Sequence, residues 1–231
     1  FLLDPDWDVR GAVVRALKGG GWRPAGAEDK VRLAIAERDW QQVAKVGIEA
    51  LGPVVAALRI DGMREDVAGT LGEIAERVAD RSALAAAVEP LVEALSGPFR
   101  DESHQDMVIV ALGRIGDPRA VPPLLPLLEG ERRRQRVVTA KVLGEIGDAR
   151  AVPALARAAR DTDGERASAA SMAIAQIAAR SADAGAFAVL GELLGEERDV
   201  DCVRLAEALR PAGRPALDWL VAVLRHCDAL R

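Results

Sequence analysis

Apolar residues recur every three or four positions along most of the chain. Between residues 101 and 115, for example, Val108, Ala111, Leu112 and Ile115 fall on one side of a helix. These four positions would form the buried stripe of the helix. This spacing predicts amphipathic helices.

Stop and start signals separate the helical stretches. Gly116 and Gly147 stand where such stretches end, and glycine readily takes the left-handed conformation that closes a helix. The aspartates that follow, Asp117 and Asp148, can cap the next helix by accepting hydrogen bonds from its free amides. Pro118 then suits a first helical position, where its missing donor costs nothing. The pattern predicts pairs of helices joined by short turns.

The helix pairs are copies of one another. Residues 113–122 and 144–153 match at eight of ten positions, with an offset of 31 residues. One such pair cannot bury its apolar stripe alone, and so neighbouring pairs must stack. We expect first helices near 6–18, 62–79, 101–115, 132–146, 164–180 and 199–210, and second helices near 49–60, 84–96, 118–129, 149–160, 184–195 and 214–228.

A segment without the repeat, about 19–47, follows the first helix. It opens on a glycine-rich loop and contains two short amphipathic stretches, 28–38 and 39–46. No linker divides the chain, and so we expect one domain over 1–231, an all-α, right-handed α-solenoid of about six helix pairs with a two-helix insert. The chain begins at Phe1 instead of Met, which suggests that it was cut from a longer one.

Composition narrows the classes of protein. Half of the residues are apolar, only 3% are aromatic, and no tyrosine occurs. That content is too apolar for a disordered chain and poor in strand-forming residues, and no run is long enough to span a membrane. The 31 basic and 36 acidic residues give a net charge of −5. This balance argues against nucleic-acid partners and anionic membranes.

The segments Val9-Arg10, 112–121 and 143–152 resemble the HEAT-like repeats named for the phycobilisome lyase family. The family signature is roughly Val-Arg-x-x-Ala-Ala-x-Ala-Leu-Gly-x-Ile-Gly-Asp-x-Arg-Ala-Val. The resemblance implies a bacterial repeat protein. A curved helical solenoid offers an extended concave surface, and so we expect it to bind a protein or peptide partner there. The resemblance also implies an alternative, an ancillary subunit of a chromophore lyase or similar enzyme. A HEAT-fold DNA-binding or repair protein is a third and less favoured alternative, because such a protein needs a continuous basic channel.

The resemblance further implies that the first helix of each pair lines the concave face. The spacing agrees, since Met107, Val110 and Arg114 share a helix face distinct from the apolar stripe. Neighbouring positions carried over in the same way include Glu145, Glu165 and Gln176. The expected partner-binding residues are Met107, Val110, Arg114, Arg134, Val138, Lys141 and Met172.

Several of these residues leave a second interpretation open. Met107 and Val138 would fit packing between repeats equally well. The basic run 131–136 favours a solvated face, although an acidic partner or a phosphate group would also explain cations at the start of a helix, where the helix dipole opposes them. Trp7 and Trp22 are expected in the core or as end caps.

The sequence contains no catalytic motif. We find no phosphate-binding loop, no Gly-x-Ser-x-Gly and no Cys-x-x-Cys, and two histidines cannot supply a multi-histidine metal site. We therefore expect a non-enzymatic scaffold without cofactor or metal, and no small-molecule ligand. Cys202 and Cys227 are expected to be reduced thiols in a cytoplasmic protein.

Overall fold

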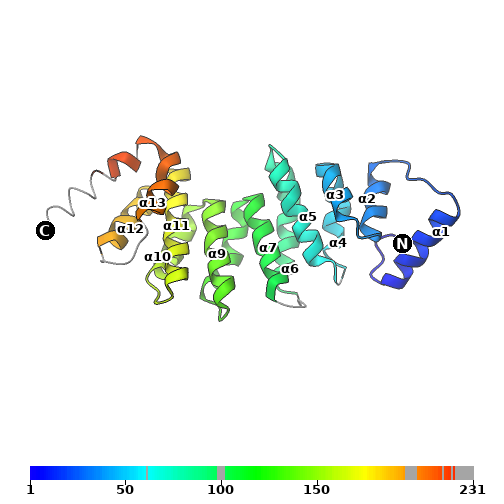
Figure 1. Cartoon of the computed structure of the whole chain (residues 1–231), viewed down its shortest axis with the longest axis horizontal. Helices are drawn as coiled ribbons and strands as arrows, with labels where there is room; N and C mark the ends of the chain where they lie inside the picture. The colour runs from blue at the N-terminus through cyan, green and yellow to red at the C-terminus, as the bar shows by residue number, and fades with distance from the viewer. Residues whose placement is uncertain (61, 98–101, 196–201, 215, 220, 222–231) are drawn as a thin grey trace. The chain divides into compact units, whose positions relative to one another are not determined.

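The described chain consists of helices joined by short turns and has no β-strand (Figure 1). The computed structural model describes all residues except 61, 98–101, 196–201, 215, 220 and 222–231. These described residues form two units, Phe1–Asp117 and Pro118–Arg231. Within each unit, successive helix pairs stack in the manner of an α-solenoid.

The first unit contains seven α-helices and two 3-10 helices among its described residues. They are α1 (Trp7–Gly19), α2 (Ala27–Ala36), α3 (Trp40–Val46), η1 (Gly47–Ala50), α4 (Leu51–Ala57), α5 (Arg64–Arg77), η2 (Arg81–Ala87), α6 (Val88–Leu95) and α7 (Glu102–Ile115).

The second unit continues the same alternation. Its described elements are η3 (Pro118–Ala120), α8 (Val121–Leu124), η4 (Leu125–Glu129), α9 (Arg133–Ile146), η5 (Ala149–Ala151), α10 (Val152–Ala159), α11 (Gly164–Ser181), α12 (Ala184–Gly195), α13 (Cys202–Leu209) and η6 (Arg210–Ala212).

The expected turn chemistry is present between α9 and η5. Gly147 has a φ of 79° and its amide donates to the carbonyl of Leu143 at 3.1 Å, which closes α9. The Asp148 carboxylate then accepts a hydrogen bond from the Arg150 amide at 2.8 Å and starts η5. Gly116, with a φ of 75°, ends α7 in the same way. The predicted glycine stops and the Asp148 cap are confirmed.

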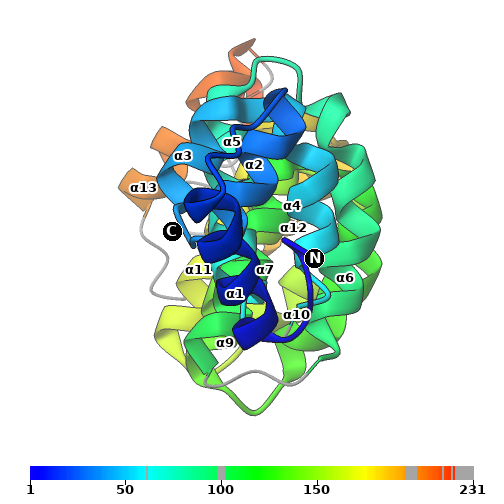
Figure 2. The same ribbon diagram turned by 90° about the vertical axis from the view of Figure 1, so that its right-hand side faces the viewer.

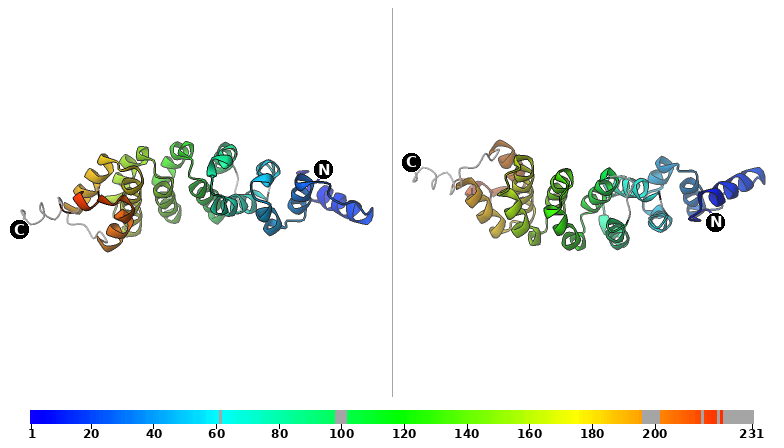
Figure 3. Two further views of the ribbon diagram at one scale, coloured as in Figure 1. Left: turned by 90° about the horizontal axis from the view of Figure 1, so that it is seen from above. Right: turned by 90° about the horizontal axis from the view of Figure 1, so that it is seen from below.

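First helices pack against first helices in both units. In the first unit α5 contacts α3 and α7, whereas α4 contacts α5, and α6 contacts α7. Figure 2 shows α4 and α6 to the right of α3 in this unit. In the second unit α11 contacts α9, α10, α12 and α13. Figure 3 shows most of these helices close to end-on, whereas α1, in dark blue, is seen along its length.

The segment 19–47 contains both of its expected helices, as α2 and α3. The structure adds that α3 takes the place of a short first helix, because it packs against α5 and leads through η1 into α4. Val43 and Ala44 of α3 are buried, which joins the segment to the core of the first unit.

The apolar stripes form the core. Val108, Ala111, Leu112 and Ile115 are all buried, as expected from their spacing. Alanines fill much of the space between α9, α10 and α11, and they allow the helix backbones to lie close together. Every large side chain added at such a contact would separate the helices.

Proline changes the predicted helix 118–129. The segment is helical, but it is divided into η3, α8 and η4, because prolines at 118, 122, 123 and 126 lack the amide that an α-helical hydrogen bond needs. The predicted helix 214–228 lies mostly outside the described residues, as does Cys227. The side chain of Cys202 is also outside them.

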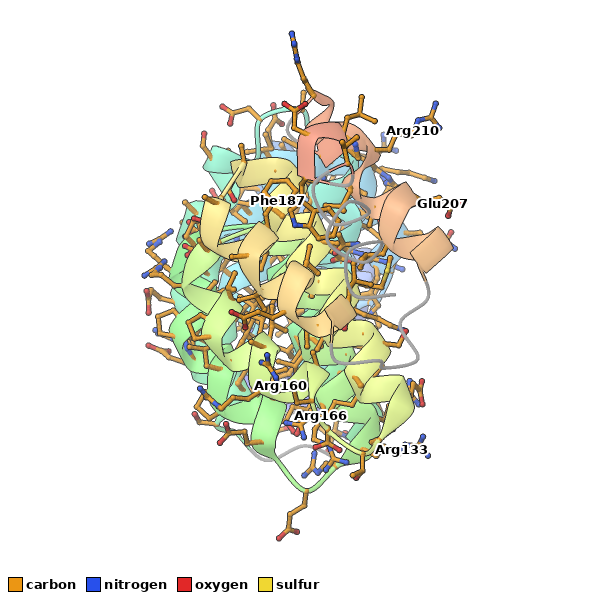
Figure 4. All side chains as sticks on the ribbon, turned by 90° about the vertical axis from the view of Figure 1, so that its left-hand side faces the viewer. Arg133, Arg160, Arg166, Phe187, Glu207 and Arg210 are labelled. Atoms are coloured by element: carbon orange, nitrogen blue, oxygen red, sulfur yellow. The ribbon has the colours of Figure 1, made fainter. Side chains whose placement is uncertain are left out.

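The expectation for Trp7 as a core residue is wrong. Its side chain is 73% exposed, and the one buried residue of α1 is Arg10. Trp22 also lies at the surface. Near the other end of the chain, the Trp219 ring packs beside Phe187 of α12, labelled in Figure 4, and donates to the Phe187 carbonyl at 2.7 Å.

Candidate partner-binding groove

Helices α9 and α11 approach closely at a glycine. A Cβ atom on Gly144 would lie 2.7 Å from the Cα of Ala173 and 2.3 Å from Oε1 of Gln176. No real side chain tolerates such distances, so glycine is required wherever these two backbones meet at this spacing. This contact sets the depth and width of the groove between the two helices.

The groove between α9 and α11 has a volume of about 430 Å³. One wall carries Lys141 and Glu145, which are one helical turn apart on α9. The other wall carries Ser168, Met172 and Gln176, spaced four residues apart on α11. Ala169 and Glu165 complete its lining.

Most polar side chains of the groove have no partner inside the protein. Within the described residues, the Lys141 ammonium, the Glu145 carboxylate, the Ser168 hydroxyl and the Gln176 amide make no hydrogen bond and no ion pair. Lys141 and Glu145 are both exposed. The groove therefore combines a thioether, an unpaired cation and an unpaired anion with donors and acceptors that face solvent.

The arginines at the start of α9, unlike most polar side chains of the groove, form hydrogen bonds within the protein. Arg133 donates two hydrogen bonds, of 2.9 and 3.1 Å, to the carboxylate of Asp163, the residue that caps α11. These hydrogen bonds hold the pKa of Asp163 below its ordinary value and raise the pKa of Arg133. Arg136 donates to the carbonyl of Gly130 at 3.0 Å. Two arginines of the basic run thus connect repeats or tie loops.

Side chains near the start of other first helices make similar hydrogen bonds to main-chain carbonyls. Arg166, which lies with Arg133 at one end of the second unit in Figure 4, donates to the carbonyl of Leu128 at 2.6 Å. In the first unit Gln105 donates to the carbonyl of Leu95 at 3.1 Å. These side chains satisfy loop carbonyls that the helices leave open.

The expected site residues of the first unit lie on α7. Two of them pack over glycines of α5. The methyl end of Met107 is 3.0 Å from the position of a Cβ on Gly69. Arg114 lies over Gly72 and forms an ion pair with Glu76 at 3.0 Å. Met107 is still 41% exposed, and Val110 is half-buried.

The expected site residues of the second unit are Arg134, Val138 and Lys141 on α9 and Met172 on α11. The structure brings Lys141 and Met172 together in the groove, whereas Arg134 is exposed outside it and Val138 is half-buried. Ser168 was missed by the sequence analysis. Its position four residues before Met172, on the same helix face, is the signal that would have found it.

Two family patterns match the chain. HEAT repeats match residues 121–210, and the PBS lyase HEAT-like repeat matches residues 105–130. Residues 105–210 are thus HEAT-like repeats, and repeats of this kind generally serve as scaffolds for protein interaction.

A solved structure shares the fold. The crystal structure of an engineered protein matches with a TM-score of 0.55 and 20% sequence identity, over 90% of this chain and 97% of its own. No curated protein sequence matches the chain. Among the described residues, no helix has the length and apolar character needed to cross a membrane.

Proposed function

We propose that the protein is a non-catalytic scaffold whose protein partner occupies the groove between α9 and α11. The observation that carries this proposal is a set of polar side chains around Met172 that have no partner among the described residues, namely Lys141, Glu145, Ser168 and Gln176. An apolar centre ringed by polar groups is the usual composition of a protein-binding surface.

Two other surfaces are weaker candidates. A hollow of about 390 Å³ near Leu2 and Val13 is mostly apolar, and Arg32 on its border already pairs with Glu28 at 2.5 Å. The arginines around Asp163 already form ion pairs with carboxylates of the same protein. Neither surface offers a comparable set of unused donors and acceptors.

The groove chemistry also favours a protein over a nucleic acid. Glu145 and Glu165 both border the groove, and carboxylates repel the phosphates of a nucleic-acid backbone. No feature of the described residues favours the chromophore-lyase subunit. The cytoplasmic location remains a prediction from the sequence.

A groove-filling variant tests the proposed site. Peptides selected on the wild-type protein from a random display library should lose binding to Ser168→Trp, because the indole fills the groove. They should keep binding to Ala188→Trp, which adds the same side chain at an exposed position on α12. Selected peptides that bind the two variants equally, or a library without binders, would contradict the proposal.

A further inference from the structure

Lys141 and Glu145 present opposite charges one turn apart on the same wall of the groove. We infer that the groove takes an extended peptide segment that carries an acidic residue, an apolar residue and a basic residue in succession, in either direction of the chain. This inference rests on the proposed function and adds the chemistry of the partner.

The spacing of the two charges fits an extended chain. Four residues of an α-helix rise about 6 Å. Alternate residues of an extended chain point to the same side and lie about 6.6 Å apart. A carboxylate at one peptide position can therefore reach Lys141 while a cation two positions away reaches Glu145.

The middle residue of such a peptide would point toward the other wall. Met172 lies there, between Ser168 and Gln176 on the same face of α11. A thioether accommodates apolar side chains of varied shape. The Gln176 amide has both a donor and an acceptor for a peptide group, and the Ser168 hydroxyl has the same capacity.

The width of the groove argues for an extended occupant over a helical one. Packed helix axes lie about 8–10 Å apart, whereas a helix with its side chains is about 10–12 Å wide. Because Gly144 lets α9 approach Ala173 so closely, the axes of α9 and α11 belong at the narrow end of that range. An extended chain is slimmer and can lie between the two walls.

The two charges are available to a partner. An ion pair with lysine before glutamate at this helical spacing is weaker than the reverse order. Lys141 and Glu145 form no such pair here, and within the described residues no other charged group satisfies them. By contrast, Arg133 is committed to Asp163.

The test uses three blocked peptides with common neutral flanks and the central triplets Asp-Leu-Lys, Lys-Leu-Lys and Asp-Leu-Asp. Binding is followed by the ¹³C-methyl signals of the chain's three methionines. Met172 reports on the groove, Met63 is buried at 1% exposure, and Met107 lies in the other unit, so the last two serve as internal controls.

Wild-type protein should bind the mixed-charge peptide about fivefold more tightly than either like-charged peptide, the ratio expected of exposed ion pairs. Lys141→Glu should shift the preference to Lys-Leu-Lys, and Glu145→Lys should shift it to Asp-Leu-Asp. These exchanges hold whichever way the peptide runs. Loss of the preferences at high salt would agree with their electrostatic origin.

Failure of the inference differs from failure of the proposed function. If all three peptides shift the Met172 signal equally in every variant, the charge rule is wrong and the groove remains a binding site. If none of the three shifts the Met172 signal at a concentration of several millimolar, the inferred motif is wrong. Binding of the library-selected peptides, which is lost in Ser168→Trp, then decides the proposed function separately.

Discussion

Arg133 at the start of α9 holds the carboxylate of Asp163, the residue that caps α11, through two hydrogen bonds. The Asp163 carboxylate also accepts from the amides of Glu165 and Arg166. One carboxylate therefore serves as helix cap and as inter-repeat ion pair. The start of one repeat is fixed by a side chain of the repeat before it.

This relationship predicts a pH dependence of stability. The pKa of Asp163 is lower in the folded protein than the ordinary value of 3.8, because Arg133 and two amides favour the ionised form. The stabilisation that the ionised Asp163 carboxylate contributes is complete at a pH above its pKa in the unfolded chain. It is lost as the pH falls through the lower pKa of the folded protein. We expect Asp163→Asn to lower the urea midpoint at pH 7, with a difference from wild type that shrinks as the pH falls below the ordinary value of 3.8.

Glu129 and Arg157 provide the control for that experiment. They form an ion pair at 3.2 Å, but both side chains are more than 60% exposed. Exposed pairs of this kind contribute little. Glu129→Gln should leave the urea midpoint nearly unchanged at every pH. A midpoint for Asp163→Asn that follows wild type across the whole range would show that the cap and ion pair are dispensable.

Gly144 is predicted to be intolerant of any side chain. Gly144→Ala should destabilise the protein by about 1 to 3 kcal/mol from overpacking against Ala173, which outweighs the gain of about 1 kcal/mol in helix propensity. Gly164→Ala, at the first residue of α11 with nothing within 4 Å of the added Cβ, should be neutral or stabilising. Chemical denaturation compares the two, and equal stabilities would refute the close approach of α9 and α11.

Arg10 is the buried residue of α1 and is predicted to hold that helix to the preceding segment. Its guanidinium donates to the carbonyls of Asp4 and Pro5, the latter at 3.0 Å. Arg10→Ala should lower the protection of α1 amides against hydrogen exchange by about 1 to 3 kcal/mol, since two carbonyls lose a charged donor. Arg15→Ala, an exposed position of the same helix, should leave α1 protection unchanged.

Arg114 is predicted to matter for structure and not for the groove. Its guanidinium pairs with Glu76 across Gly72, and it belongs to the first unit. We expect Arg114→Gln to leave the affinity for the Asp-Leu-Lys peptide unchanged, whereas Lys141→Gln lowers it about threefold, as for the loss of one exposed ion pair. A similar loss in Arg114→Gln would contradict the assignment of Arg114 to a structural role.

The sequence by itself determined the local structure of this protein. The repeat, the apolar stripe through Leu112 and the stops at Gly116 and Gly147 all follow from interactions within a few residues. Helical spacing and left-handed glycine are properties of short segments, and so they can be recognised without the fold. The sequence also placed Lys141 and Met172 at equivalent positions of successive repeats, 31 residues apart.

Only the tertiary structure decided which of the expected surface residues share a site. Lys141 and Met172 meet because Gly144 lies against Ala173, and that contact depends on how two helices pack. The packing of helices also decides that Arg133 pairs with Asp163 and that Arg114 pairs with Glu76. Charge and exposure follow from the sequence pattern, but whether a charge is already paired depends on neighbours distant in the chain.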